Sequence, residues 1–243
     1  LKTAQPFKEL LRRSVKKVPS LQGKSVLNLF YEPSTRTRSS FEISAKRLSA
    51  DVTNFAVSTS SVVKGESILD TIDTLQAMRV DYIIVRHSQS GVPNLIARHS
   101  KASVLNAGDG YHAHPTQALL DAYTLREVIP ESTGKKVLIV GDLLYSRVAR
   151  STSEILEKMD VQVGVLGPGP LIPRTRPDYL KTFCSFDDAL AWKPDVIYLL
   201  RIQLERQEAQ FFPSLREYHR YFGVTSERLK RIAGEGIYIM HPG

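Results

Sequence analysis

The sequence predicts an α/β protein with two similar-sized domains, each a parallel sheet flanked by helices. Three observations favour this fold class. Short apolar runs alternate with segments of helical periodicity along most of the chain, as in parallel-sheet units. The length of 243 residues suits two modest domains better than one. A turn-rich segment at 129–134 follows a long helical pattern and precedes a new strand. We therefore expect one domain over residues 1–130 and another over residues 131–243.

The predicted strands are apolar runs of strand length, rich in Val, Ile, Leu and Tyr. In order along the chain they cover residues 25–31, 52–57, 82–85, 104–106, 136–141, 161–166, 196–200 and 237–240. Helical patterns lie between them, at residues 34–49, 66–78, 93–99, 115–128 and 146–159. Open sheets of this kind bind ligands beyond the carboxyl ends of their strands. The polar residues that follow each strand are therefore the candidates for a functional site.

The charge of the chain favours anionic partners. Its net charge is +8, which suits small phosphorylated molecules or nucleic acid. The basic residues are scattered, however, and the densest groups, at 12–17 and 228–231, have helical spacing, which predicts solvated helix faces. No apolar stretch approaches the roughly 20 residues that cross a bilayer, so we expect no membrane role.

The single cysteine, Cys184, excludes an internal disulfide framework and favours a reducing compartment, so we expect a cytoplasmic protein. Its neighbours Phe183 and Phe186 predict a small buried residue rather than a reactive thiol. Both ends of the chain look cut. The start at Leu1 lacks an initiating Met and a signal-peptide pattern, and the last predicted strand runs directly into residues 241–243.

A phosphate site is predicted where the first strand leads into a helix. Ser34 is placed to cap that helix, whose unpaired N–H groups and dipole favour an anion. The hydroxyls of Ser34, Thr35 and Thr37 would complete the cradle, and Arg36 would add bidentate contacts. The alternative is an ordinary capped helix with surface arginines. The combination of strand, loop, cap and alternating hydroxyls and arginines favours the phosphate site.

The segment Glu-Pro-Ser-Thr-Arg-Thr-Arg at 32–38, followed by Ser-Phe-Glu at 40–42, resembles the carbamoyl-phosphate-binding signature of the aspartate and ornithine carbamoyltransferases. The resemblance continues in order to the end of the chain, through the segments 64–66, 86–87, 107–110, 114–117, 141–142, 147 and 240–243. It implies the carbamoyltransferase fold and transfer of the carbamoyl group of carbamoyl phosphate, without a metal or organic cofactor. For an aspartate acceptor, this reaction is the committed step of pyrimidine biosynthesis.

The resemblance also assigns the residues that bind carbamoyl phosphate. His114 lies at a loop-to-helix junction and would contact the carbamoyl oxygen with Thr37 and Arg86. Arg86 would bridge the phosphate and carbamoyl oxygens, Gln117 would orient the carbamoyl amide, and Gly243 would belong to the loop that binds the carbamoyl amino group. A metal reading of His112 with His114 is disfavoured, because no third ligand is evident at a useful spacing.

The acceptor is predicted from the second half of the chain. The turn after strand 136–141 lacks the glycine fingerprint of dinucleotide-binding proteins, which disfavours a nicotinamide cofactor. Arg147 would instead hold a carboxylate. The pattern Arg-x-Gln-x-x-Arg from Arg201 resembles the aspartate-binding segment of aspartate carbamoyltransferases, although a charged helix start is the plain alternative. Arg201 and Gln203 would then bind the side-chain carboxylate of L-aspartate. Transfer to ornithine or another amine is the alternative acceptor.

The polar loop at 58–66 is, on its own, an ordinary surface loop. The resemblance implies that its Ser60 and Lys64 reach into the active site of a neighbouring subunit in a homotrimer, where Lys64 would help to bind aspartate. A regulatory or pathway-enzyme partner is compatible with the sequence. A basic nucleic-acid-binding module is supported by charge alone, because the sequence shows no recognised binding motif or aromatic platform.

Overall fold

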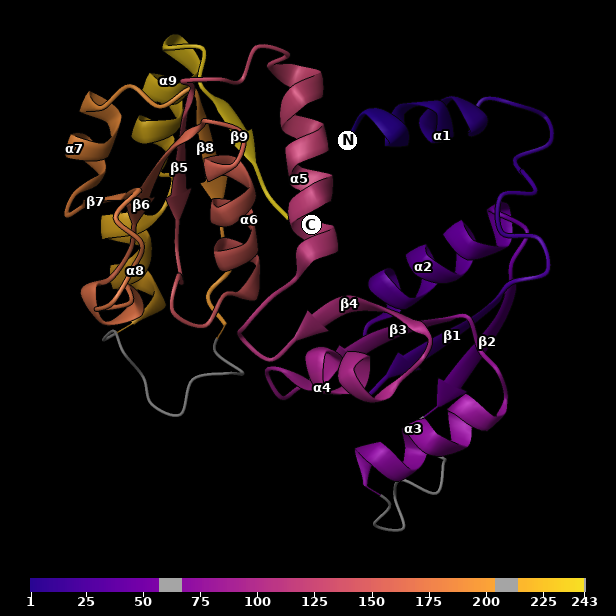
Figure 1. The fold of residues 1–243 in the computed structure, drawn as a ribbon. Helices are drawn as coiled ribbons and strands as arrows, with labels where there is room; N and C mark the ends of the chain where they lie inside the picture. Colours follow the sequence, from indigo (N-terminus) through magenta and orange to yellow (C-terminus); the bar gives the residue numbers. More distant parts are fainter. Residues whose placement is uncertain (57–66, 204–213, 243) are drawn as a thin grey trace. The chain divides into compact units, whose positions relative to one another are not determined.

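The computed structural model describes residues 1–56, 67–203 and 214–242. The chain forms two compact units, Leu1–His114 and Pro115–Gly243. Each unit contains one parallel sheet with helices on both faces (Figure 1). The predicted fold class is therefore confirmed.

The sheet of the first unit has the strand order β2-β1-β3-β4, and all of its pairs are parallel. Its strands are β1 (Ser25–Phe30), β2 (Asp51–Ala56), β3 (Tyr82–His87) and β4 (Ser103–Asp109). Strand β3 extends two residues beyond the prediction, because Arg86 pairs with Phe30 and His87 with Asp109. Arg86 is thus held by the sheet itself.

Helices cover both faces of this sheet (Figure 1). They are α2 (Thr35–Arg47), α3 (Ile68–Ala77) and α4 (Val92–His99). Helix α1 (Gln5–Leu10) and the short 3-10 turn before it, η1 (Lys2–Ala4), precede them in the chain. The alternation along β1 explains the two cores. Val26 and Phe30 pack with α2, whereas Leu27 and Leu29 pack with α3 and α4.

The sheet of the second unit has the order β7-β6-β5-β8-β9, again with parallel pairs only. Its strands are β5 (Lys136–Val140), β6 (Gln162–Leu166), β7 (Leu180–Phe183), β8 (Val196–Leu199) and β9 (Tyr238–Met240). Strand β7 escaped the sequence analysis, because this edge strand carries Lys181 and Thr182 in place of a continuous apolar run.

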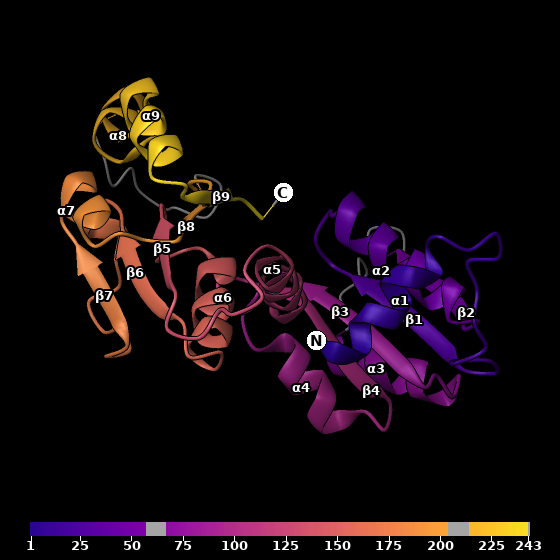
Figure 2. The same ribbon diagram turned by 90° about the horizontal axis from the view of Figure 1, so that it is seen from above.

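The helices of the second unit also divide between two faces (Figure 2). They are α5 (Pro115–Val128), α6 (Arg147–Glu157), α7 (Phe186–Ala191), α8 (Leu215–Phe222) and α9 (Ser226–Gly234), with a 3-10 turn, η4 (Gly169–Leu171). Leu125 of α5 and Leu156 of α6 share one core with β5. Leu190 of α7 and Ile232 of α9 share the other.

Helix α5 belongs to the second unit by its contacts, whereas the sequence placed it in the first domain. Leu125 packs with Val137 and Leu156, which belong to the second sheet and to α6. The turn at 129–134 is where α5 leads into β5, and it marks a change of direction rather than a change of core. The bounds of α5 itself, Pro115–Val128, agree with the prediction.

Two other expectations were wrong. Cys184 is exposed, although its neighbours Phe183 and Phe186 are buried. The basic segment at 12–17 is not helical, since α1 ends at Leu10. The second basic group, at 228–231, does lie on helix α9. Among the described residues, none of the helices has both the length and the apolar character needed to span a membrane.

The strand order of each sheet contains one switch point. In the first unit the chain leaves β1 for β2 on one side and returns to β3 on the other. In the second unit the same reversal separates β5 from β8. Ligands of open α/β sheets bind outside the carboxyl ends of the two strands that flank such a point. The segments that follow β1, β3, β5 and β8 are therefore where a site is expected.

Candidate active site

Helix α2 begins directly beyond the end of β1, and its N-cap differs from those of α3, α6, α7, α8 and α9. Ser34 is the N-cap residue, as predicted, with extended backbone at φ −160° and ψ 92°, but its side chain makes no capping hydrogen bond. Hydroxyls cap the first turn of α3, α6, α7, α8 and α9, through Ser67, Ser146, Ser185, Ser214 and Thr225. First-turn N–H groups have no partner within a helix. Those of α2 are thus not occupied by the Ser34 hydroxyl, which suits an anion site.

Arg86 joins the residues at this switch point. Its Nε donates to Glu32 Oε2 at 3.1 Å, and its Nη1 donates to Thr37 Oγ1 at 3.3 Å. The same Nη1 donates to the Ala107 carbonyl oxygen at 3.3 Å and lies 3.5 Å from His114 Nε2. The structure therefore brings together Thr37, Arg86 and His114, which were predicted from distant parts of the sequence. We call these residues, with Glu32, the first cluster.

The first cluster is largely shielded from water. The side chain of Arg86 is 13% exposed and that of Glu32 is 21% exposed. Their ion pair is therefore less screened by water than an ion pair between fully exposed side chains. His114 is 8% exposed. Donors to a developing negative charge are thus held close together in a low-dielectric environment.

The other predicted residues of this region lie on the first turn of α2. Thr35 and Arg36 are exposed, and Ser34 is half-buried. His87, which follows Arg86, is instead a packing residue. Its ring lies 4.7 Å from that of Tyr31, its Nδ1 accepts a hydrogen bond from Gln89 N, and burial lowers its pKa. His87 therefore supports the end of β3 by packing.

Gln117, on the first turn of α5, is held by a hydrogen bond to Asp121, one turn further along the helix. Its Nε2 donates to Asp121 Oδ1 at 2.9 Å. Asp121 is buried and also accepts bonds from Thr152 Oγ1 at 3.2 Å and from the Tyr198 hydroxyl at 2.6 Å. Burial raises the pKa of Asp121, although all three donors oppose that shift, and burial likewise raises the pKa of Tyr198. This network fixes the orientation of the Gln117 amide.

In the second unit, a hydrogen bond joins the segment after β5, which contains Asp142, to the segment after β8, which contains Gln203. The Oδ2 of Asp142 accepts a bond from Gln203 N at 3.2 Å, and its Oδ1 accepts one from Tyr145 N at 2.9 Å. Arg201 Nη2 donates to Gln203 Oε1 at 3.2 Å, and Gln203 Nε2 donates back to the Arg201 carbonyl at 3.2 Å. We call Asp142, Arg201 and Gln203 the second cluster. Arg147 begins α6 and is buried, at 2% exposed.

Sequence reasoning gave no role to Glu32 or Asp142, although both stood within the segments that carry the family resemblance. Each acid follows a strand end closely and contacts a predicted residue of the same switch point. An acidic residue after an apolar strand, in a chain of net charge +8, was the available signal. The predicted residues Ser60, Lys64 and Gly243 lie outside the described residues.

His112 and His114, the pair considered above as a metal site, have separate partners. His112 Nδ1 lies 2.9 Å from Asp109 Oδ2, and His114 belongs to the first cluster. In the part of the chain that the structure describes, no group of three or more His, Cys, Asp or Glu side chains is placed to hold a metal ion.

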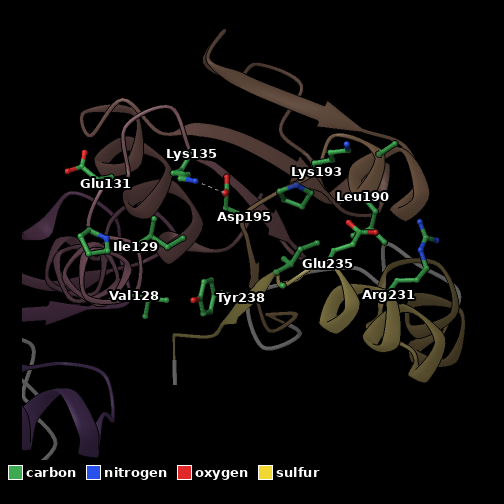
Figure 3. Close-up of a pocket in the computed structure, with 15 residues that line it drawn as sticks. Val128, Ile129, Glu131, Lys135, Leu190, Lys193, Asp195, Arg231, Glu235 and Tyr238 are labelled. Carbon is green, nitrogen blue, oxygen red and sulfur yellow. Dashed lines mark hydrogen bonds and ion pairs between the residues drawn. The ribbon is translucent and has the colours of Figure 1, made fainter.

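A cavity of about 920 Å³ lies elsewhere in the second unit (Figure 3). It is lined at the amino ends of β5, β8 and β9, where Lys135 Nζ donates to Asp195 Oδ1 at 3.2 Å and Tyr238 forms part of the wall. None of the predicted site residues lines it. The amino ends are the edge of the sheet opposite to the switch point, so this cavity is separate from the second cluster.

Residues 1–127 match the family described as aspartate/ornithine carbamoyltransferase, carbamoyl-P binding domain. The chain is 69% identical over 243 residues to the aspartate carbamoyltransferase catalytic subunit of Akkermansia muciniphila, covering all of this chain and 79% of that protein. It is 55% identical over 244 residues to the same subunit of Endomicrobium trichonymphae, with 100% and 78% covered.

Solved structures of the same kind are also similar. Aspartate transcarbamoylase from Trypanosoma cruzi, in complex with carbamoyl aspartate and phosphate, superposes with a TM-score of 0.86 at 29% identity, over 100% of this chain and 79% of that one. The T. cruzi enzyme has also been solved with carbamoyl phosphate and aspartate, at a TM-score of 0.85. The catalytic subunit of M. jannaschii aspartate transcarbamoylase gives a TM-score of 0.79 at 37% identity, over 100% and 80% of the two chains.

Proposed function

The chain belongs to the aspartate/ornithine carbamoyltransferase family, and we propose that the two clusters are the parts of its active site that bind the two substrates. The enzyme transfers the carbamoyl group of carbamoyl phosphate to the amine of L-aspartate, giving N-carbamoyl-L-aspartate and phosphate. One observation chiefly supports the proposal. Arg86 contacts Thr37 and lies 3.5 Å from His114 at the switch point of the first sheet.

Carbamoyl phosphate binds at the first turn of α2 and at the first cluster in this proposal. The phosphate accepts bonds from the hydroxyls and backbone N–H groups of residues 34–37 and from the Arg36 guanidinium. The carbamoyl oxygen accepts bonds from Thr37, Arg86 and His114. As the neutral amine attacks the carbamoyl carbon, negative charge develops on that oxygen. Donors held in place before the reaction stabilise this charge without reorganising.

Arg86 is well suited to this role because other groups hold it. Glu32 binds its Nε, while the Ala107 carbonyl oxygen binds its Nη1. The guanidinium is thus oriented from two sides before a substrate arrives. Gln117, anchored on Asp121, orients the carbamoyl amide, and Gly243 belongs to the loop that binds the carbamoyl amino group.

Aspartate is proposed to bind Arg147, Arg201 and Gln203. Its two carboxylates need cationic or amide donors, which these three side chains supply. The Arg201–Gln203 contact holds both side chains on one loop. Ornithine would present an amine side chain, which calls for an acidic partner instead. The names of the relatives agree with aspartate as the acceptor.

The assembly is proposed from the resemblance. The enzyme would act as a homotrimer in which Ser60 and Lys64 of one subunit complete the site of its neighbour, with Lys64 binding aspartate. The substrate domains would be residues 1–130 for carbamoyl phosphate and 131–243 for aspartate. The family match over residues 1–127 supports this division, although α5 packs with the second sheet. A cytoplasmic location and a regulatory or pathway-enzyme partner remain predictions.

A steady-state assay of carbamoyl transfer tests the proposal directly. Arg36→Ala and His114→Ala should each lower turnover by on the order of 10²–10³-fold, as for loss of an oxyanion donor. Arg47→Ala, at the far end of the same helix as Arg36, is the matched control and should stay within about twofold of the parent. Near-full turnover of either site variant would remove that residue from the site. Replacing aspartate by ornithine in the assay should abolish product formation.

A further inference from the structure

Asp109 is a buried carboxylate at the end of β4, five residues before His114. It is 1% exposed and has four hydrogen-bonding partners. Its Oδ1 accepts from Asn106 Nδ2 at 2.8 Å and from Ala113 N at 3.2 Å. Its Oδ2 accepts from Gly91 N at 2.7 Å and lies 2.9 Å from His112 Nδ1, which donates when it carries the ring proton. Every one of these donors is an N–H group.

This donor set fits the acceptors of a carboxylate. Such a group has two oxygens with two lone pairs each, so it accepts about four hydrogen bonds and donates none. Asparagine has the same shape but keeps only one accepting oxygen, and its NH₂ group would face two N–H donors. Because the site is buried, donors left without an acceptor are costly. No isosteric side chain can therefore replace Asp109.

The four bonds join segments that carry the first cluster. Ala113 directly precedes His114, and Gly91 is the N-cap residue of α4. The turn is closed further by Asp109 N, which donates to the Ala113 carbonyl at 3.1 Å. Gly110 N donates to the carbonyl of His87, which is the neighbour of Arg86, at 2.9 Å. The turn is thus fastened both to the strand of Arg86 and to the residue before His114.

Gly110 shows how closely this turn fits its surroundings. Its φ of +47° lies in the left-handed region, and a Cβ at this position would approach Ser90 Oγ to 2.5 Å. The segment from β4 to α5 is therefore a tightly packed turn in which small displacements are resisted. His114, at its end, is held within 3.5 Å of Arg86 Nη1.

We propose that Asp109 is a positioning residue of carbamoyl transfer, which acts by holding His114 in place beside Arg86. It does not touch the substrate, and its contribution passes through the turn at 107–113 to the imidazole. The kinetic part of this inference rests on the proposed function. A purely structural role would predict lost stability without a specific dependence on His114.

A double-mutant cycle separates these two roles. Asp109→Asn should lower kcat by on the order of 10²-fold, close to the effect of His114→Ala, because both remove the same aligned donor. In the His114→Ala background, Asp109→Asn should lower kcat by less than about threefold, since coupled residues are not additive. Additive losses in the double variant would overturn the proposal.

Asp81→Asn is the matched control in the same unit. Asp81 also accepts several bonds, from Lys24 Nζ at 2.8 Å, Ser25 N at 2.9 Å and Ser25 Oγ at 3.1 Å, but it precedes β3 and lies at the amino edge of the sheet. Its Asn variant should lose stability and keep kcat within about twofold. If it lowers kcat as much as Asp109→Asn does, general loosening of the unit explains both, and the proposal fails. Should Asp109→Asn not fold, Asn106→Ala removes one donor and enters the same cycle.

A spectroscopic measurement tests the inference without the reaction. The ring signals of His114 can be assigned in histidine-labelled protein by comparison with His114→Ala. Asp109→Asn should shift these signals, and Asp81→Asn should not. Unchanged His114 signals in Asp109→Asn would overturn the positioning role. If the parent enzyme forms no carbamoyl aspartate, the proposed function fails, whereas the shift of the His114 signals still decides whether Asp109 holds the ring.

Discussion

Removal of the Tyr198 hydroxyl should destabilise the second unit in a manner that depends on pH. This hydroxyl donates to Asp121 Oδ2 at 2.6 Å, the shortest of the three bonds that this carboxylate receives. Tyr198 is 1% exposed and Asp121 is 5% exposed, so water cannot easily take the place of the lost donor. Tyr198→Phe leaves the ring packing intact and removes only this oxygen.

The size of the effect follows from the burial and charge of Asp121. A hydrogen bond to a charged group contributes about 1.5–3 kcal/mol, so we expect a loss of about 2 kcal/mol at pH 8. For a unit of about 130 residues this lowers the melting temperature by roughly 6–10 °C. The bonds from Gln117 and Thr152 remain, so the unit should still fold.

The dependence on pH comes from Asp121. Burial raises its pKa above the ordinary value of 3.8. The folded state therefore binds more protons than the unfolded state between these two pKa values, and stability falls as pH rises through that range. Tyr198→Phe removes a donor that opposes the shift, so the pKa of Asp121 should rise further. The stability difference between the parent and the variant should be largest at pH 8 and should shrink as Asp121 becomes protonated at lower pH.

Calorimetric unfolding between pH 3 and pH 8 measures this difference, from below the ordinary pKa of an aspartate upward. The matched variant is Asp121→Asn, which carries no charge at any of these pH values. In that background Tyr198→Phe should cost less at pH 8, because no buried charge loses a donor. A loss that is independent of pH, or that is equal in both backgrounds, would refute the reasoning.

Three further predictions concern catalysis. Arg86→Lys keeps the charge, but the single nitrogen of lysine cannot replace two separate donors of arginine, so the rate of carbamoyl transfer should fall by about 10–10²-fold. A fall of less than threefold would contradict this. Arg79→Lys, at an exposed position, is the control. Arg201→Ala should raise the KM for aspartate by roughly tenfold or more and leave that for carbamoyl phosphate within twofold; equal changes in both would disprove specific binding. Mixed Lys64→Ala and Arg36→Ala proteins, each inactive, should regain activity if subunits share sites, and no recovery would argue against the shared trimer.

Local patterns were sufficient for most of the elements. The strands around Val26 and Val137 are apolar runs, and α5 has the bounds that its pattern predicts, because these features depend on neighbouring residues. Strand β7 was missed because an edge strand with one buried residue has no apolar run. The burial predicted for Cys184 was wrong because adjacent side chains can face different ways, and here Phe183 is buried while Cys184 is exposed.

Thr37, Arg86 and His114 could be predicted from the sequence to lie together, because polar residues that follow strands of a parallel sheet converge at one edge. Family resemblance then assigned them to a particular reaction. The structure adds the partners that hold these residues. Glu32 binds Arg86 across 54 positions, and Tyr198 binds Asp121 across 77 positions.

Such pairings arise from the order of strands and the packing of helices, which local propensity does not encode. The same reason explains why α5 joins the second unit, although a turn-rich segment follows it. The sequence by itself therefore determined most of the strands and the family, and it predicted the substrate-binding residues. Only the tertiary structure decided which buried acids hold those residues in place, because that depends on contacts between residues far apart in the chain.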